Sequence, residues 1–318
     1  MRESIGKLFG LLSLIFLLSA CKSSSLTPTH SPVVDKTLTV ITNTPPPTKQ
    51  TPSTVTQLVE ATLQPADEAM PAEIELASEN WRLWAEVPVI TRAMRDIYLL
   101  GQALGNDPYA ISILGDCQST PETFLGLYEA DATESISLPQ HLQETVTYFD
   151  KTFNRQSPTI KSGTTSGALL WAEWHEGDFG CDSDETPLDC ELRLNRPSFA
   201  IITVGTHWES NNEVYMRKII EELLAQGVVP ILSTKADNRE GEHGINLETA
   251  KLAKEYNLPL WNFWLATKAL PNHGLYTKKG DEHLGDIYLT EEALALRRYS
   301  ALAALDATWR AVAVTPFK

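Results

Sequence analysis

Residues 110–119 read Ala-Ile-Ser-Ile-Leu-Gly-Asp-Cys-Gln-Ser, a short apolar run that ends in small and polar residues. Similar runs rich in Ile and Val stand at 199–204 and 228–233, and weaker ones at 158–162 and 260–263. Near-continuous apolar runs of this length are typical of strands buried on both faces of a sheet. The stretch at 110–119 therefore predicts a buried strand followed by a polar turn.

Helical patterns alternate with these runs. Apolar residues recur at three- and four-residue spacing from Trp81 to about Leu104, with a break expected at Pro88. Further helices are expected at 141–150, 211–226, 247–256 and 290 to about 314. Strands separated by helices predict an α/β fold, a three-layer α/β/α sandwich with a central parallel sheet of about five strands. The sites of such sheets lie at the carboxyl ends of the strands.

The first twenty residues read as a secretory signal peptide. Arg2 and Lys7 precede an apolar run at 8–18 that is short for a membrane span. The ending Leu-Ser-Ala-Cys at 18–21 resembles the lipobox of bacterial lipoproteins, which implies that Cys21 is acylated and holds the protein on a membrane. The alternative is an ordinary signal peptide followed by a chance cysteine. We expect an exported protein on the outer face of the cell membrane, or in the outer membrane or periplasm, depending on the host envelope.

A linker is expected at 21–70. Of the 49 residues from 22 to 70, 23 are Ser, Thr or Pro, and none is Gly or aromatic. Such a segment cannot bury enough surface to offset its ordering entropy, and the three prolines at 45–47 favour an extended stalk. The folded domain is therefore expected at 71–318.

Composition excludes several functions. The chain has 26 Lys and Arg against 41 Asp and Glu, a net charge of -15, so it lacks the basic field of a nucleic-acid binder. It contains no Gly-rich phosphate loop, no His-Glu-x-x-His and no Cys-x-x-Cys. We expect neither a cofactor nor a metal, and nothing in the sequence indicates an oligomeric state.

Polar clusters follow the expected strands at 115–119, 162–167 and 205–212, and a further cluster at 281–284 precedes the last helix. A nucleophile, backbone donors and a late histidine are the components of acyl transfer. In order and spacing, residues 108–312 resemble the SGNH (GDSL-type) hydrolase family, and Leu-Pro-Asn-His-Gly-Leu at 270–275 is similar to a divergent exported branch. The resemblance implies a flavodoxin-like fold and metal-free ester hydrolysis through a covalent acyl-enzyme.

The resemblance assigns four motifs, most of them altered. Cys117 stands where the family has the nucleophilic Ser, and His207 where it has an oxyanion-binding Asn. Gly167 matches the oxyanion-hole glycine. His283 matches the catalytic histidine of Asp-x-x-His, but Asp281 precedes it by two residues and not by three.

Each assignment has an alternative. Cys117 is a nucleophile, an inert buried cysteine or a disulfide partner, and Ser119 is a second candidate nucleophile or a helix cap. His283 is the general base, oriented by Asp281, or a histidine of a surface loop. His207 donates to the oxyanion or fills a pocket, and this choice is even.

Further residues are expected near the mouth of the site. Asn211 lies within reach of the oxyanion, and substrate-binding roles are expected for the residues that follow, Asp116, Asp237, Asn238 and His243. Cys181 and Cys190 flank an acidic loop and are expected to form a disulfide in an oxidising compartment. Trp171 and Trp174 line a sugar-binding cleft or pack as a helix face, and the second reading is favoured.

Two functions remain. The first is a membrane-anchored hydrolase that cleaves a small-molecule or glycan ester, with O-acyl groups on carbohydrate as one option. The second is a catalytically inactive binding module of the same fold for a glycan or similar ligand. A solute-binding lipoprotein is a weaker third, because such proteins show two similar α/β lobes and this chain has one.

Overall fold

The computed structural model describes residues 76–130 and 137–313. Four parallel strands form the central sheet in the order β1-β2-β3-β4. Their bounds are β1 Asp107–Gly115, β2 Pro197–Thr203, β3 Val229–Ser233 and β4 Leu260–Trp261. The predicted parallel sheet is confirmed. Residues 1–75, with the expected signal peptide, Cys21 and most of the linker, lie outside the described residues.

The fifth strand expected at 158–162 is reduced to an isolated parallel bridge between Gly115 and Ile160. Two backbone bonds make this bridge, from the Gly115 amide to Thr159 and from the Lys161 amide to Gly115, and hydroxyl groups add to them. The Thr159 hydroxyl donates to the Ile113 carbonyl at 2.7 Å, and Ser157 and Thr159 bond each other at 2.7 Å. The segment therefore lies along the edge of β1 without continuing as a regular strand.

The α-helices flank this sheet, and short helices fill the loops. The α-helices are α1 Arg92–Leu104, α2 Gln140–Tyr148, α3 Pro187–Asn195, α4 Asn212–Ala225, α5 Gly244–Tyr256, α6 Phe263–Ala266 and α7 Glu291–Val312. The 3-10 helices are η1 Ser78–Leu83, η2 Cys117–Ser119, η3 Leu125–Tyr128, η5 Ala168–Leu170, η6 Ala172–His175, η7 Asp178–Gly180, η8 Pro271–Gly274 and η9 Glu282–Leu284. A two-stranded antiparallel ribbon joins β5 Leu275–Tyr276 to β6 Tyr288–Leu289. None of the described helices has the length and apolarity needed to span a bilayer.

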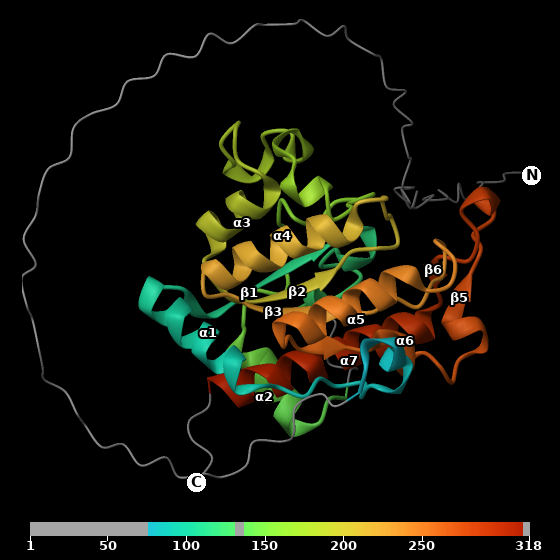
Figure 1. The fold of residues 1–318 in the computed structure, drawn as a ribbon, viewed down its shortest axis with the longest axis horizontal. Helices are drawn as coiled ribbons and strands as arrows, with labels where there is room; N and C mark the ends of the chain where they lie inside the picture. The colour runs from blue at the N-terminus through green and yellow to red at the C-terminus, as the bar shows by residue number, and fades with distance from the viewer. Residues whose placement is uncertain (1–75, 131–136, 314–318) are drawn as a thin grey trace, which may run out of the picture. The chain divides into compact units, whose positions relative to one another are not determined.

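The helices make three layers with the sheet. Helices α3, α4 and α5 pack on one face, and α1, α2 and α7 cover the other (Figure 1). This arrangement is the predicted α/β/α sandwich. The strands read as continuous apolar runs because both of their faces are buried.

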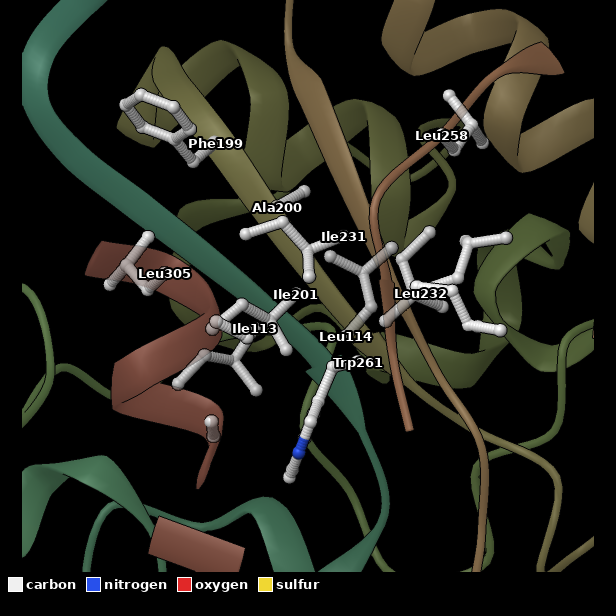
Figure 2. Packing of buried hydrophobic residues seen from close by; sticks show 14 of the residues in the cluster. Ile113, Leu114, Phe199, Ala200, Ile201, Ile231, Leu232, Leu258, Trp261 and Leu305 are labelled. Carbon is white, nitrogen blue, oxygen red and sulfur yellow. The ribbon is translucent and has the colours of Figure 1, made fainter. Parts of the chain in front are cut away.

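The core lies between these layers. Side chains of neighbouring strands and of α7 meet there, among them Leu114, Ile201, Ile231 and Leu305, all at most 1% exposed (Figure 2). Trp261 at the end of β4 is fully buried, and its indole nitrogen donates to the Ser300 hydroxyl of α7 at 3.0 Å. The last helix is thereby bonded directly to the sheet layer.

The start of the fold differs from the expected helix from Trp81 to Leu104. Residues Ser78–Leu83 form a 3-10 helix, the chain then runs extended, and α1 begins only at Arg92. Pro88 disfavours helix in the residue before it. The Asn262 amide donates to the carbonyls of Trp81 and Trp84 at 2.9 and 3.2 Å, so these groups are satisfied by tertiary contacts.

Candidate functional site

All four strands of the sheet end at the same level. Gly115 pairs with Thr203, Ile202 with Leu232, and Ser233 with Trp261. The segments that follow the strands therefore meet at one edge. A small cavity of about 20 Å³, room for a water molecule or two, opens there between charged and polar side chains. Its charged lining residues are Asp116, Lys235, Asp237 and Arg297.

A tight turn carries Cys117 away from β1. A Cβ atom on Gly115 would lie 2.2 Å from the Ser119 hydroxyl and 2.6 Å from that of Thr203, so only glycine fits. Cys117 is half-buried and belongs to no disulfide. Its thiol acts electrostatically on Arg297, which places the two side chains near each other. Cys117 therefore lies at the edge of the sheet and, of its three alternatives, is not a disulfide partner.

Ser119 takes the structural role of its two alternatives. Its side chain is fully buried, shares a hydrogen bond with Thr203 at 2.7 Å and accepts one from Arg297 at 3.1 Å. A hydroxyl that is enclosed and bonded in this way does not reach a substrate. The displaced nucleophile considered from the sequence is therefore corrected to a group that fixes the turn.

Asp116 lies beneath the turn and is 3% exposed. Its carboxylate accepts from the Gln118 amide at 2.9 Å. Burial raises the pKa of Asp116, and the nearby Asp237 raises it further. Arg297, the Gln118 amide and His207 oppose this shift but do not cancel it. Asp116 thus lies within electrostatic reach of residues from the other strand ends and lines the cavity, as its expected substrate-binding role requires.

Arg297 was missed in the sequence. It comes from the middle of α7, is 4% exposed, and donates to the Gln118 carbonyl at 2.5 Å. Its guanidinium lies 4.2 Å from the ring centroid of Phe124. Burial lowers the pKa of Arg297 to about 10, although Asp116 and Cys117 raise it. The feature that could have indicated it is a pair of arginines, 297 and 298, within the Ala- and Leu-rich stretch 293–305.

The loop after β2 reaches across to Gly167. The backbone amide of Gly167 donates to the carboxylate of Glu209, which the sequence reasoning overlooked. His207 is half-buried and acts electrostatically on Asp116. Asn211 is exposed, whereas its neighbour Asn212 is buried and accepts from the Ser166 hydroxyl at 2.9 Å. The amide side chain expected at this corner is therefore that of Asn212, because helix α4 begins there and turns Asn211 outward.

The loop after β3 contributes a buried ion-pair network. Lys235 donates to Asp237 at 2.7 Å and also to Glu240, and Thr206 donates to Asp237 at 2.8 Å. Asp237 is 3% exposed and lines the cavity, in agreement with its expected position. The Asn238 side chain accepts from the His243 amide at 2.6 Å, so it shapes the loop and does not face the cavity.

His243 lies in an aromatic cluster and not in the cavity. Its ring packs edge-on against Trp81 and Trp264, with centroid distances of 5.9 and 6.0 Å. Its Nδ1 is buried without a hydrogen-bond partner among the described residues. Burial lowers the pKa of His243, and Arg82 adds to the shift. Its expected substrate-binding role is corrected, because the tryptophan contacts fix the ring beside η1.

The loop before α7 carries the expected acid and base. His283 is exposed on η9. Asp281 accepts from the Tyr288 hydroxyl at 2.6 Å through one oxygen of its carboxylate. The Gln118 side chain donates to the Ile287 carbonyl at 3.0 Å. The loop that bears His283 is thus bonded to the residue after Cys117, but neither His283 nor Asp281 lines the cavity.

The expected disulfide between Cys181 and Cys190 is present. Within the described ranges, the grouping of side chains that could hold a metal is Cys181, Glu185 and Cys190, and the disulfide uses both sulfur atoms. Trp171 is 53% exposed, and its ring lies 6.4 Å from that of Trp174. The favoured reading of these tryptophans as a packed helix face is therefore wrong for Trp171, which lies on the surface.

Comparisons with known proteins give structural likeness at low identity. A GDSL-like lipase from Bacteroides thetaiotaomicron VPI-5482 is 17% identical, with a TM-score of 0.37, and the match covers 69% of this chain and 98% of that one. An acetyl xylan esterase is 16% identical, with a TM-score of 0.34, and the match covers 65% of this chain and 100% of that one. No family model and no curated protein matches the chain.

Proposed function

We propose that the chain is an exported, membrane-anchored ester hydrolase that uses Cys117 as its nucleophile. The observation that carries the proposal is the setting of Cys117. Its half-buried thiol follows β1 at the polar edge of the sheet, beside the buried guanidinium of Arg297. A nearby cation is the setting in which cysteines form reactive thiolates.

The reaction takes two steps. The base takes the proton of the Cys117 thiol as the sulfur attacks the acyl carbon, a carbon–sulfur bond forms, and the carbonyl electron pair moves onto oxygen. The tetrahedral intermediate collapses, the bond to the alcohol oxygen breaks, and the leaving alkoxide takes a proton from the base. Water then attacks the thioester, which releases the carboxylic acid and restores the thiol.

His283 is the proposed base. The hydrogen bond from Gln118 to the Ile287 carbonyl connects its loop to the turn that carries Cys117, and the proposal requires the exposed imidazole to approach the thiol. Catalytic hydrogen bonds often tighten only when substrate is bound. His207 and the Gly167 amide are the proposed donors to the oxyanion.

An O-acylated carbohydrate is the proposed substrate class. Trp208 is 44% exposed and immediately precedes Glu209, whose carboxylate contacts Gly167. Trp171 is also exposed and follows the same glycine by four residues. Two exposed indoles beside the site offer flat apolar faces for sugar rings.

The test is an esterase assay of the full-length chain in detergent, with p-nitrophenyl acetate and acetylated xylan as substrates. Cys117→Ala is expected to lower kcat roughly 1,000-fold or more, and His283→Ala to lower it by about 100-fold. Mass spectrometry of Cys117 during turnover is expected to show an acetyl adduct. His141→Ala, a change at an exposed histidine of α2, is the control.

His207→Ala separates the two histidines. A loss with His207→Ala and full activity with His283→Ala would transfer the role of base to His207. If wild type matches Cys117→Ala at background on both esters, the hydrolase proposal fails.

A second candidate is a binding module that does not catalyse. Two contacts favour it: the Asp281 carboxylate accepts a hydrogen bond from the Tyr288 hydroxyl, and the Glu209 carboxylate accepts one from the Gly167 amide. This candidate predicts that acetylated xylan quenches tryptophan fluorescence equally in wild type and Cys117→Ala, without turnover.

Anchoring is tested separately with Cys21→Ser, which is expected to move the chain from the membrane to the soluble fraction.

A further inference from the structure

The carboxylate of Glu209 lies directly against Gly167. The glycine amide donates to Oε1, and the Ser166 hydroxyl lies 3.2 Å from the same oxygen. A Cβ atom built on Gly167 would lie 2.6 and 2.8 Å from the two carboxylate oxygens. The chain's own carboxylate thus occupies the space over this amide.

Neutral groups alone hold this carboxylate in the described part of the chain. The side chain of Asn212 donates to Glu248 at 3.0 Å, which turns its oxygen toward Ser166. The Ser166 proton goes to that oxygen at 2.9 Å, so it contributes little to the longer contact with Glu209. No Lys, Arg or His of the described residues forms an ion pair with Glu209. The Gly167 amide is then its main partner.

The position of Glu209 in its loop allows the side chain to leave. The neighbouring residues Trp208, Ser210 and Asn211 are all exposed. Asn212 begins α4 and is anchored by its own bonds to Ser166 and Glu248. A rotation of the Glu209 side chain toward solvent therefore exposes the Gly167 amide without moving the helix.

We propose that the Gly167 amide, beside Ser166, forms a binding site for an oxygen atom of a small carboxylate or acyl group, and that Glu209 fills this site as a displaceable internal ligand. The inference rests on the proposed function in so far as that site serves catalysis. The ligand is a monocarboxylate such as acetate, or the acyl oxygen of an ester. Both compete with Glu209 for the same amide.

Internal competition lowers apparent affinity. A ligand that needs the Gly167 amide binds only the fraction of molecules from which Glu209 has withdrawn. Its apparent dissociation constant is therefore the intrinsic constant divided by that fraction. A substitution that removes the carboxylate lifts this penalty. Glu209→Gln keeps an oxygen that accepts from the amide but loses the charge, so it should lift the penalty only in part.

The binding experiment follows the Gly167 amide by ¹⁵N–¹H NMR in the full-length chain, titrated with sodium acetate and, as a salt control, sodium chloride. Acetate is expected to shift this resonance saturably in Glu209→Ala, with roughly tenfold tighter apparent binding than in wild type and an intermediate value in Glu209→Gln. Glu213→Ala, which removes a more exposed carboxylate in the first turn of α4, is expected to match wild type. Equal acetate affinity in wild type and Glu209→Ala, or no response beyond chloride, would overturn the inference.

An activity arm separates the two proposals. If both hold, Glu209→Ala raises kcat/KM for p-nitrophenyl acetate by roughly tenfold, with Cys117 still required. Tighter acetate binding in Glu209→Ala without any hydrolysis refutes the proposed function and supports the internal ligand. Hydrolysis that depends on Cys117 but is unchanged in Glu209→Ala, with no gain in acetate binding, supports the proposed function and refutes the internal ligand.

Discussion

Two buried carboxylates, one packed against β1 and one directly after its end, differ in how many hydrogen bonds they accept. Glu191 on α3 is fully buried and accepts from Ser112, Ser157 and the Arg155 guanidinium. Asp116 is nearly as buried, accepts from one backbone amide and borders a cavity. Burial raises the pKa of Asp116 even with Arg297 nearby. The comparison teaches that the number of hydrogen bonds a buried carboxylate accepts, and not its burial, separates a structural carboxylate from one available for ligand chemistry.

The largest effect on the free energy of unfolding is expected at Glu191, the carboxylate that accepts more hydrogen bonds. Glu191→Ala leaves two hydroxyls and a guanidinium without their acceptor, so the free energy of unfolding should fall by about 3 kcal/mol. Urea unfolding measures the change, with the exposed Glu173→Ala as control. A loss below about 0.5 kcal/mol would remove the distinction between the two carboxylates.

Removal of the disulfide beside Glu191 is expected to cause the second-largest loss in the free energy of unfolding. Cys190 precedes Glu191 on α3, and its bond to Cys181 closes a short loop with a sequence separation of 9. The double variant Cys181→Ser with Cys190→Ser should lose about 2–3 kcal/mol through the larger entropy of the unfolded chain. Thermal unfolding with and without reductant tests this. Reductant should destabilise wild type and leave the double variant unchanged, and equal responses would contradict the prediction.

A pH-dependent effect is expected at Asp116. Because the pKa of Asp116 is raised in the folded state, its protonated form is favoured there. Its contribution is complete below the unfolded pKa of about 3.9 and is lost as pH rises through the folded value. Asp116→Asn cannot ionise, so its stability relative to wild type should increase as pH rises above the unfolded pKa of about 3.9 and through the folded value. Urea unfolding across this range decides, with the exposed Asp178→Asn expected to show no such trend.

The smallest effect is expected at His243, which is less buried than Asp116. Burial lowers its pKa, and Arg82, His273 and Lys235 add to the shift while Glu240 opposes it. Its stabilising contribution is therefore present above the unfolded pKa of about 6.5 and is lost as pH falls through the folded value. Because glutamine does not titrate, His243→Gln should lose less stability than wild type as pH falls below the unfolded pKa of about 6.5. Parallel curves for wild type and variant would show that His243 does not titrate in this range.

The sequence predicted the sheet better than the site. The runs at 199–204 and 228–233 lie within two residues of the bounds of β2 and β3, because strands buried on both faces leave a continuous apolar signal. The helix expected from Trp81 was wrong, since the first turns are held by Asn262, a residue remote in sequence. Local spacing carries no record of such a contact.

The site shows the same limit. Position after a strand indicated Cys117, Asp116 and Asp237, which the fold does bring to one edge. Arg297 and Glu209 could not be found in this way. Their roles depend on α7 lying beneath the first turn and on the β2 loop reaching Gly167. Contacts between segments this far apart follow from packing and not from any motif.

Arg297 also has a consequence for how the protein matures. The turn that carries Cys117 receives its guanidinium from α7, which is synthesised nearly 180 residues after the turn itself. A chain emerging in order from its N-terminus holds that thiol in an unfinished turn until α7 docks. Truncation before α7 leaves the Gln118 carbonyl and the Ser119 hydroxyl without this donor. The turn is therefore assembled only after α7 has been synthesised.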